Sequence, residues 1–146
     1  MKKIVNYICA PRLRVDSVSK NFNDKNILNN VSFSLYPGEV LCLLGASGCG
    51  KTSLLRIIAG LDKYFNGNIL INEEIISSNS IYIPPDRRPI SMLFQDYALF
   101  PHMTVEENIK YGLKELRKDQ KTFKVNKIID DLGLTDHKGK YPHELS

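Results

Sequence analysis

The stretch that decides the fold reads Val40-Leu41-Cys42-Leu43-Leu44-Gly45-Ala46-Ser47-Gly48-Cys49-Gly50-Lys51-Thr52. Its first part is continuously apolar, which is typical of a strand covered on both faces of a sheet. Residues 45–52 match the pattern G-x-x-x-x-G-K-[ST] of a phosphate-binding loop. Residues 51–59 have few polar positions on any side and stop before Gly60, which predicts a buried helix. A buried strand, a glycine-rich loop and a buried helix in this order predict a P-loop α/β fold.

Residues 45–53 have the chemistry that a nucleotide phosphate chain requires. Several backbone N–H groups must point at one anion, so the loop has to curl tightly, and glycine permits this. The helix that begins at Lys51 adds the positive end of its dipole. Lys51 supplies a positive charge to the phosphate oxygens, and the hydroxyl of Thr52 can ligate Mg²⁺. The candidate nucleotide-binding residues are Gly45, Ala46, Ser47, Gly48, Cys49, Gly50, Lys51, Thr52 and Ser53.

The residues before this stretch predict an antiparallel pair of strands. Residues 13–19 and 31–35 alternate apolar and polar side chains, as half-buried strands do. In the first strand the inward positions are Leu13, Val15 and, less cleanly, Ser17. Pro37-Gly38 then predicts a type II turn, because proline fixes φ at the first central position and glycine accepts positive φ at the second.

The second half of the chain predicts a mixture of strands and helices. A short hairpin is expected over 68–72 and 75–76, and an apolar strand over 90–94. A capping box, Thr104 with Glu107, predicts a helix that runs to about residue 114. Another helix is expected over about 122–132, where Gly133 ends it.

Length and composition bound the possibilities. With 146 residues, 42% of them hydrophobic and 25% charged, the chain has the composition of one globular domain. The net charge of +4 is too small to indicate a nucleic-acid partner. The apolar region after Met1 is brief and broken by Asn6, which argues against a signal peptide. The histidines and cysteines show no metal-ligand spacing.

A phosphate-binding loop does not define one reaction, and two other classes share this motif. A GTPase is suggested by Asp130-Asp131-Leu132-Gly133, which fits D-x-x-G, but Asp130 falls within an expected helix and Gly133 is the expected helix terminator. A soluble P-loop kinase is the other class, and the sequence shows no lid or substrate signature for it.

Four motifs in order resemble the ATP-binding cassette (ABC) transporter ATPases, and the likeness covers nearly the whole chain. Val18-Ser19-Lys20-Asn21-Phe22 is similar to the aromatic loop of the family, and the phosphate loop follows at a similar spacing. The stretch from Phe94 through Gln95 to Ile109 is very similar to the Q-loop region. Residues 141–146, Tyr141-Pro142-His143-Glu144-Leu145-Ser146, resemble the approach to the LSGGQ signature.

The resemblance implies roles for particular residues. The ring of Phe22 would stack on adenine, and Lys51 and Gln95 would act in ATP hydrolysis. Thr52 and Gln95 would contact Mg²⁺. In this interpretation the cofactors are ATP and Mg²⁺, and the protein is the motor subunit of an importer for polyamines or ferric iron. The sequence of a nucleotide-binding subunit does not report its cargo.

The resemblance also implies partners and a location. Integral-membrane permease subunits would dock on the Q-loop region, where residues 97–103 carry aromatic and apolar side chains. A second nucleotide-binding subunit would complete a dimer, and a periplasmic binding protein would act indirectly. The protein would lie at the cytoplasmic face of the inner membrane, as a peripheral subunit, and no nucleic acid is expected.

The sequence departs from the family pattern at Ser146, two residues into the signature. We therefore expect the front portion of a nucleotide-binding domain that binds ATP weakly without turnover and has exposed sheet edges. A nucleotide-binding remnant with no transport role is the alternative. The expected organisation is an antiparallel β portion (13–36 and 68–83), a P-loop core with the Q-loop (37–67 and 84–100), and the start of a helical subdomain (101–146).

Overall fold

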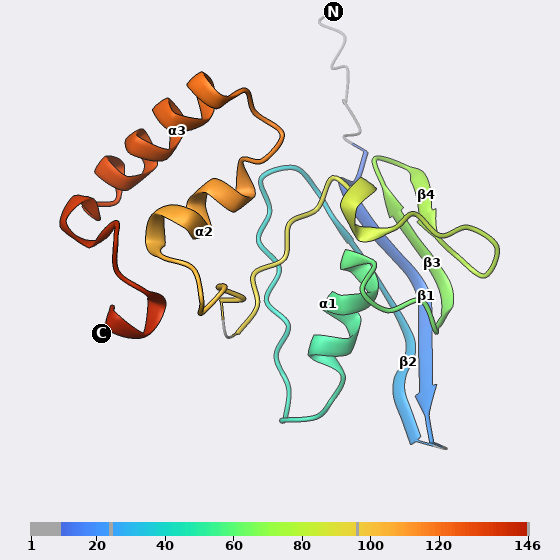
Figure 1. Cartoon of the computed structure of the whole chain (residues 1–146). Helices are drawn as coiled ribbons and strands as arrows, with labels where there is room; N and C mark the ends of the chain where they lie inside the picture. The colour runs from blue at the N-terminus through green and yellow to red at the C-terminus, as the bar shows by residue number, and fades with distance from the viewer. Residues whose placement is uncertain (1–9, 24, 96, 146) are drawn as a thin grey trace, which may run out of the picture. The chain divides into compact units, whose positions relative to one another are not determined.

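The computed structural model describes residues 10–23, 25–95 and 97–145. The amino-terminal residues 1–9, on which the expectation about a signal peptide falls, lie outside the described residues, and so do Asp24, Asp96 and Ser146. The chain forms two compact units, residues 1–92 and residues 93–146 (Figure 1).

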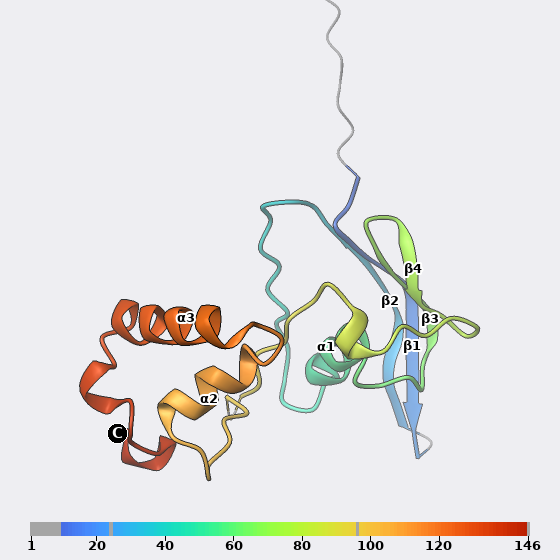
Figure 2. The ribbon, with the colours of Figure 1, turned by 45° about the horizontal axis from the view of Figure 1, so that its top comes forward.

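The first unit is built on an antiparallel sheet. Its strands are β1 (Leu13–Phe22), β2 (Lys25–Leu35), β3 (Asn66–Ile71) and β4 (Glu74–Ser77). Their order is β2-β1-β3-β4, so β1 lies between β2 and β3, as Figure 2 also shows. All three pairings are antiparallel. The two predicted strand pairs, 13–19 with 31–35 and the hairpin at 68–76, are therefore confirmed.

A bulge in β1 corrects the predicted inward face of this strand. The register shifts between Val15 and Val18, and Ser17 adopts a left-handed backbone with φ of 53°. One extra residue in a strand turns the side chains that follow to the opposite face. Val18, which is fully buried, therefore takes the inward position that the alternation assigns to Ser17.

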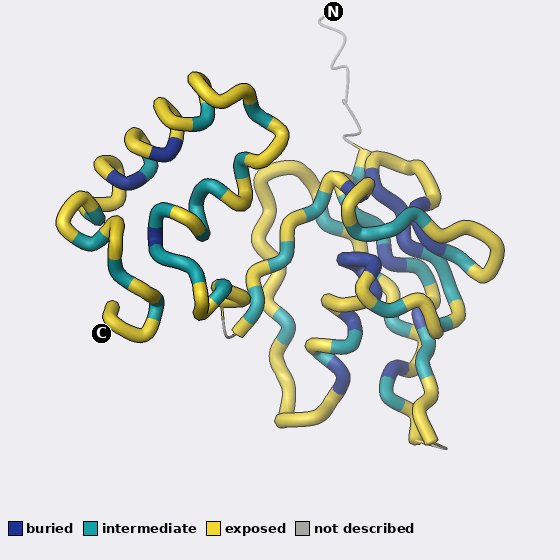
Figure 3. The backbone as a smooth tube through the Cα atoms, in the orientation of Figure 1, coloured by how far each residue is buried: buried dark blue, intermediate teal, exposed yellow. Residues whose placement is uncertain are grey.

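The buried helix predicted after the phosphate loop is α1 (Lys51–Ala59). It ends at Gly60, whose backbone is left-handed with φ of 78°. Leu54, Ile57 and Ile58 of α1 form one apolar cluster with side chains of the sheet, including Val15 and Ile69. Figure 3 shows these buried segments as dark blue stretches of α1 and of the strands. This packing fixes α1 on one face of the sheet, and with it the loop at its amino end.

Two strands that the sequence predicts are absent from the described residues. Residues 40–44 and 90–94 have no sheet partner there, and the side chains of Val40 and Leu44 are 90% and 92% exposed. In Figure 3 the segment before the phosphate loop is mostly yellow, the colour of exposed residues. A strand that is apolar on both sides needs a neighbouring strand at its edge and a layer on each face. The described residues supply no such neighbour, so the predicted strands do not form.

A turn before the phosphate loop and one short helix after β4 complete the described part of the first unit. Gly38 has φ of 82° and the N–H of Glu39 donates to the carbonyl of Tyr36 at 3.1 Å, which agrees with the type II turn expected there. A short 3₁₀ helix, η1 (Pro85–Arg87), follows β4 and its loop.

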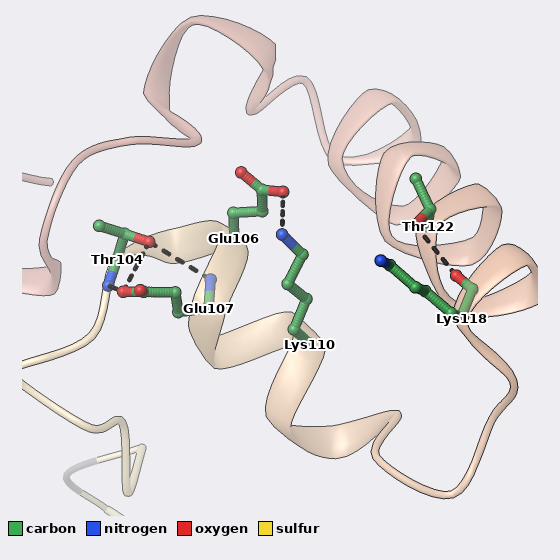
Figure 4. Close-up of polar contacts among 6 residues, drawn as sticks. All are labelled: Thr104, Glu106, Glu107, Lys110, Lys118 and Thr122. Atoms are coloured by element: carbon green, nitrogen blue, oxygen red, sulfur yellow. Dashed lines mark hydrogen bonds and ion pairs between the residues drawn. The ribbon is translucent and has the colours of Figure 1, made fainter.

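The second unit is helical. It contains α2 (Val105–Gly112), α3 (Lys118–Asp131) and the short helices η2 (Thr135–His137) and η3 (Pro142–Glu144). The predicted capping box at Thr104 and Glu107 is present and starts α2 (Figure 4). The expected helix over 122–132 starts four residues earlier, at Lys118, and Gly133 follows it with φ of 65°. No helix in the described part of the chain has the length and apolar character needed to cross a membrane.

Candidate nucleotide-binding site

Most backbone N–H groups of the phosphate loop, residues 45–50, have no hydrogen-bond partner among the described residues. Among the N–H groups of residues 45–50, only that of Cys49 donates to a backbone carbonyl within the described part of the chain. Its acceptor is the carbonyl of Ala46, at 3.3 Å. The first N–H groups of α1 add to this set, because the first turn of a helix has no internal acceptor for them. The first turn of α1 also carries no acidic side chain. The amino end of α1 and its loop therefore offer an anion several unpaired donors and no opposing charge.

Glycine is required at Gly50, where the loop meets the sheet. Gly50 is buried and has φ of 94°, a left-handed backbone. A Cβ atom there would lie 2.6 Å from the carbonyl oxygen of Ile27 and 2.9 Å from the Leu28 side chain. This close approach to β2 holds the amino end of α1, and it explains why the last glycine of the motif accepts no side chain.

The ammonium of Lys51 lies across the phosphate loop. Its Nζ donates to the carbonyl oxygens of Gly45 and Ala46, both at 2.7 Å, and lies 3.4 Å from the Sγ of Cys49. The positive charge of Lys51 is therefore already placed beside the unpaired N–H groups, where it would attract an anion.

Thr52 lies in the first turn of α1 and is exposed. Because the residue is exposed, its hydroxyl oxygen is accessible to a ligand. A hydroxyl is a hard oxygen donor, of the kind that Mg²⁺ accepts together with phosphate oxygens. Thr52 thus fits the metal role that the sequence predicts for it.

A largely apolar cavity of about 450 Å³ adjoins Lys51 and Thr52. Seven apolar side chains line the rest of it: Leu13, Phe33, Leu35, Leu41, Leu43, Leu55 and Ile58. Cys42 lies within the adjoining extended segment and is exposed. The sequence places Cys42 inside a buried strand, so this expectation is wrong for the same reason as the predicted strand itself.

Phe22 ends β1 and its side chain is 62% exposed. It lines a second cavity, of about 660 Å³, together with Lys20, Asp62 and Tyr64 among others. The side chains lining the cavity beside Lys51 do not include Phe22. In Figure 1 the arrowhead of β1 and the loop before α1 lie toward the same end of the first unit. The structure therefore leaves the ring of Phe22 accessible but does not bring it into the cavity beside Lys51.

An ion pair fixes the end of β1 close to Phe22. The Nζ of Lys20 lies 2.5 Å from a carboxylate oxygen of Asp62 and donates also to the carbonyl of Tyr64 at 3.2 Å. Both charged side chains are mostly buried. This pair attaches the strand to the segment that follows α1 and sets the wall of the cavity that Phe22 lines.

The carboxyl end of α1 is held by residues to which the sequence assigns no role. The guanidinium of Arg88 donates from Nη1 to the carbonyls of Ile57 and Ile58, at 3.0 and 2.8 Å. The hydroxyl of Tyr82 donates to the carbonyl of Gly60 at 2.6 Å. No periodicity or motif spacing marks an arginine as a helix cap from this distance along the chain, so sequence patterns could not have revealed the contact.

Gln95 belongs to the second unit, where it is exposed and lies in a turn. The N–H of Tyr97 donates to the carbonyl of Phe94 at 3.0 Å across this turn. Both Tyr97 and Ala98 have left-handed backbones, with φ of 58° and 49°. Non-glycine residues rarely adopt this conformation, so the turn after Gln95 carries backbone strain.

The side chain of Asn108 organises the loop that follows Gln95. Its Oδ1 accepts from the N–H of Phe100 at 2.9 Å, and its Nδ2 donates to the carbonyls of Phe100, Met103 and Thr104 at 3.0–3.1 Å. One amide on α2 thereby fixes both ends of residues 100–104. The Q-loop resemblance includes Asn108, but the sequence pattern does not identify this role.

The amino end of α2 also receives the segment that precedes residues 141–145. The N–H of Val105 donates to the carbonyl of Lys140 at 2.9 Å, and the N–H of Glu106 to that of Lys138 at 3.0 Å. The stretch after Gln95 and the stretch that resembles the approach to the signature therefore share one framework inside the second unit.

A P-loop at the amino end of a helix that packs on a sheet defines a nucleotide-binding protein of the P-loop class. The profile of the family described as "ABC transporter" matches residues 28–146, which is most of the chain. The chain therefore belongs to the ABC transporter family, and membership of this family implies nucleotide binding.

Relatives agree with this assignment. The putrescine transport ATP-binding protein PotG of Escherichia coli is 41% identical over 139 residues, which are 94% of this chain and 36% of that protein. The Fe(3+) ions import ATP-binding protein FbpC 2 of Haemophilus influenzae is 39% identical over 149 residues, covering 100% of this chain and 41% of that protein. The chain thus spans about two fifths or less of the length of these relatives.

A solved structure confirms the α/β P-loop fold. It is cbiO1 from Clostridium perfringens, described as part of the ABC transporter complex cbiONQ. The TM-score is 0.73 at 28% identity, and the match covers 93% of this chain and 56% of that one.

Proposed function

We propose that this chain supplies the ATP-binding part of the motor subunit of an ABC importer. The observation that carries the proposal is the set of unpaired N–H groups in residues 45–50, placed at the amino end of α1 with the ammonium of Lys51 beside them. These groups suit the β- and γ-phosphates of ATP, which present several anionic oxygens to one side.

The remaining residues of the proposed site take separate tasks. The backbone N–H groups of Gly45 to Ser53 bind the phosphates, and Lys51 neutralises part of their charge. Phe22, with its exposed ring, offers a face on which adenine stacks. Thr52 would hold Mg²⁺, which when bound neutralises phosphate charge, and the same metal role is proposed for Gln95 from the family resemblance alone. Gln95 is proposed to orient the attacking water.

The proposal extends to partners and cargo. The exposed side chains of Tyr97 and Leu99 would contact integral-membrane permease subunits at the cytoplasmic face of the inner membrane. A second nucleotide-binding subunit completes the proposed dimer, and a periplasmic binding protein delivers the solute to the permease. The named relatives are ATP-binding proteins of putrescine transport and of Fe(3+) ion import, and we propose a cargo of one of these two classes.

The experiment is a titration of the 146-residue polypeptide with MgATP by isothermal titration calorimetry. We expect the Lys51→Ala variant to lose at least tenfold in affinity, because the loop then lacks its only lysine charge. Lys127→Ala removes an exposed lysine of α3 and serves as the matched control, with unchanged affinity. Equal Kd values for Lys51→Ala and the wild-type chain would refute the assignment of the loop.

Hydrolysis is measured in the same samples by phosphate release. We expect no turnover by this polypeptide, because these 146 residues contain no match to the Walker B aspartate and catalytic glutamate with which the family binds Mg²⁺ and polarises the attacking water. Steady phosphate release that Lys51→Ala abolishes would overturn this part of the proposal.

A further inference from the structure

The carboxyl end of α1 is attached to the loop after β4 by a buried arginine. Arg88 is only 6% exposed, and its guanidinium bonds to Ile57 and Ile58 of α1 through Nη1. Its Nε donates to the carbonyl of Ile83 at 2.6 Å. One side chain therefore joins the last turn of α1 to the segment that follows β4.

The guanidinium of Arg88 packs closely against Gly60, at the carboxyl end of α1. A Cβ on Gly60 would lie 2.4 Å from Nε of Arg88 and 2.6 Å from its Cζ, so the guanidinium packs directly on the backbone at the end of the helix. The Arg88 guanidinium also lies 5.4 Å from the centre of the Tyr82 ring. Tyr82 in turn bonds to the carbonyl of Gly60. Three of the carbonyls that end α1 thereby receive donors from two side chains.

Burial of a cation without a carboxylate is costly, so this arrangement requires compensation. Desolvation lowers the pKa of Arg88, and the bonds to helix carbonyls, which carry the negative end of the helix dipole, stabilise the charged form. No ion pair joins Arg88 to an acidic side chain in the described part of the chain. Its described hydrogen bonds all go to backbone carbonyls, from Nη1 to α1 and from Nε to Ile83, and Nη2 is buried without a partner among the described residues.

The position of α1 determines where the phosphate loop presents its N–H groups. A helix of nine residues is marginal by itself and depends on its tertiary contacts. At its amino end α1 is held through Gly50 against β2, and at its carboxyl end through Arg88 and Tyr82. The segment before the phosphate loop, residues 40–44, has no sheet partner within the described residues and contributes little restraint.

We propose that Arg88 is a positioning residue for nucleotide phosphate binding: by capping the carboxyl end of α1 it sets the depth and orientation at which the amino end of the same helix meets the phosphates. This inference rests on the proposed function, since it concerns the same phosphate site. Arg88 touches no nucleotide atom in this proposal and acts only through α1.

The test compares Arg88→Met with Arg87→Met, which removes the neighbouring arginine. Arg87 is exposed and makes no side-chain hydrogen bond within the described residues, so it is a matched control. Each variant is titrated calorimetrically with MgATP, with inorganic tripolyphosphate and with adenosine. We expect Arg88→Met to raise Kd at least tenfold for MgATP and tripolyphosphate at unchanged stoichiometry. The affinity of Arg88→Met for adenosine should remain that of the wild-type chain, and so should the affinities of Arg87→Met for all three ligands.

A purely structural role gives a different result. If Arg88 only stabilised the fold, the stoichiometry would fall with the folded fraction while Kd stayed constant, and that outcome overturns the proposal. If Arg88→Met fails to fold, the same titrations are made with the milder variants Arg88→Lys and Tyr82→Phe. We expect each of them to raise the Kd for MgATP and for tripolyphosphate about threefold. Unchanged Kd values in both milder variants also overturn it.

The outcome is separable from that of the proposed function. Weak binding by Lys51→Ala together with wild-type binding by Arg88→Met refutes only the role of Arg88. Wild-type binding by Lys51→Ala refutes the phosphate site itself.

Discussion

At Gly50 a hydrogen atom in place of a side chain decides whether the phosphate loop can form. The backbone is left-handed, and a Cβ atom would lie only 2.6 Å from the carbonyl oxygen of Ile27, too close for an ordinary contact. We expect Gly50→Ala to lower the free energy of unfolding by about 1–2 kcal/mol through the left-handed backbone alone. The displaced contact with β2 should add to this loss and weaken MgATP binding at least tenfold. Urea unfolding and calorimetric titration measure the two effects.

Gly112 provides the control for this prediction. It ends α2, has no positive φ, and a Cβ there would meet no atom within 4 Å. Gly112→Ala should therefore leave nucleotide binding unchanged and leave stability unchanged or slightly raised, since alanine favours helix more than glycine does. If Gly50→Ala binds MgATP as the wild-type chain does, the loop does not need the conformation described here.

At the scale of single elements, the sequence correctly predicted those features that depend on contacts between residues close together in the chain. The capping box, the glycine after α1 and the alternation of β2 each act within a few residues, and all three are present in the structure. The predicted strands at 40–44 and 90–94 depend instead on neighbours beside them in a sheet. An apolar run forms a buried strand only where other strands complete the sheet. The sequence of the run itself does not show whether those neighbouring strands are present.

The capping box of α2 yields a prediction about pH. The backbone N–H and the hydroxyl of Thr104 both bond to the carboxylate of Glu107 and lower its pKa below the ordinary value of 4.5. A lowered pKa in the folded state stabilises the fold above pH 4.5, and this contribution is lost as the pH falls through the folded pKa. Thr104→Ala should cost about 1 kcal/mol at pH 7, the usual effect of removing a helix N-cap side chain.

Two measurements check the capping prediction. Carbon NMR titration of the Glu107 carboxyl should give a midpoint below 4.5 in the wild-type chain and a midpoint closer to 4.5 in Thr104→Ala. The difference in unfolding free energy between the two chains should shrink as the pH falls below 4.5. Thr122, whose hydroxyl bonds to the carbonyl of Lys118 within α3, is the control position (Figure 4). The variant keeps the backbone N–H of residue 104, so a Glu107 midpoint that Thr104→Ala leaves unchanged would contradict the contribution assigned to the Thr104 hydroxyl.

At the scale of the whole molecule, the candidate site divides into a part that the sequence reveals and a part that it does not. The phosphate loop is contiguous, so its residues could be named from one motif. The contact between Arg88 and Ile57 joins residues 31 positions apart, and the Asn108 bonds to residues 100–104 depend on how one loop folds back on α2. Such contacts are visible only in the folded chain, because the types and spacing of the residues do not show whether the contacts form.

The exposed apolar side chains of Val40 and Leu44 have a consequence for the molecule in solution. Val40 and Leu44 present apolar side chains beside backbone groups that no strand within the described residues pairs. Unpaired strand-like segments with apolar side chains promote association between chains. We expect the double substitution Val40→Lys and Leu44→Lys to reduce self-association of the polypeptide several-fold, since the added charges repel and the apolar surface is removed. Static light scattering over a concentration series measures the effect.

The matched control for this prediction is Phe123→Lys, which removes a similarly exposed apolar side chain from α3. Because all three positions are exposed, the free energy of unfolding should change by no more than about 0.5 kcal/mol in either variant. Self-association should persist in Phe123→Lys, because that residue lies on a helix whose backbone groups are already paired. If both variants reduce scattering equally, general surface charge rather than the unpaired segment governs association. Residues 40–44 would then have no specific role in self-association.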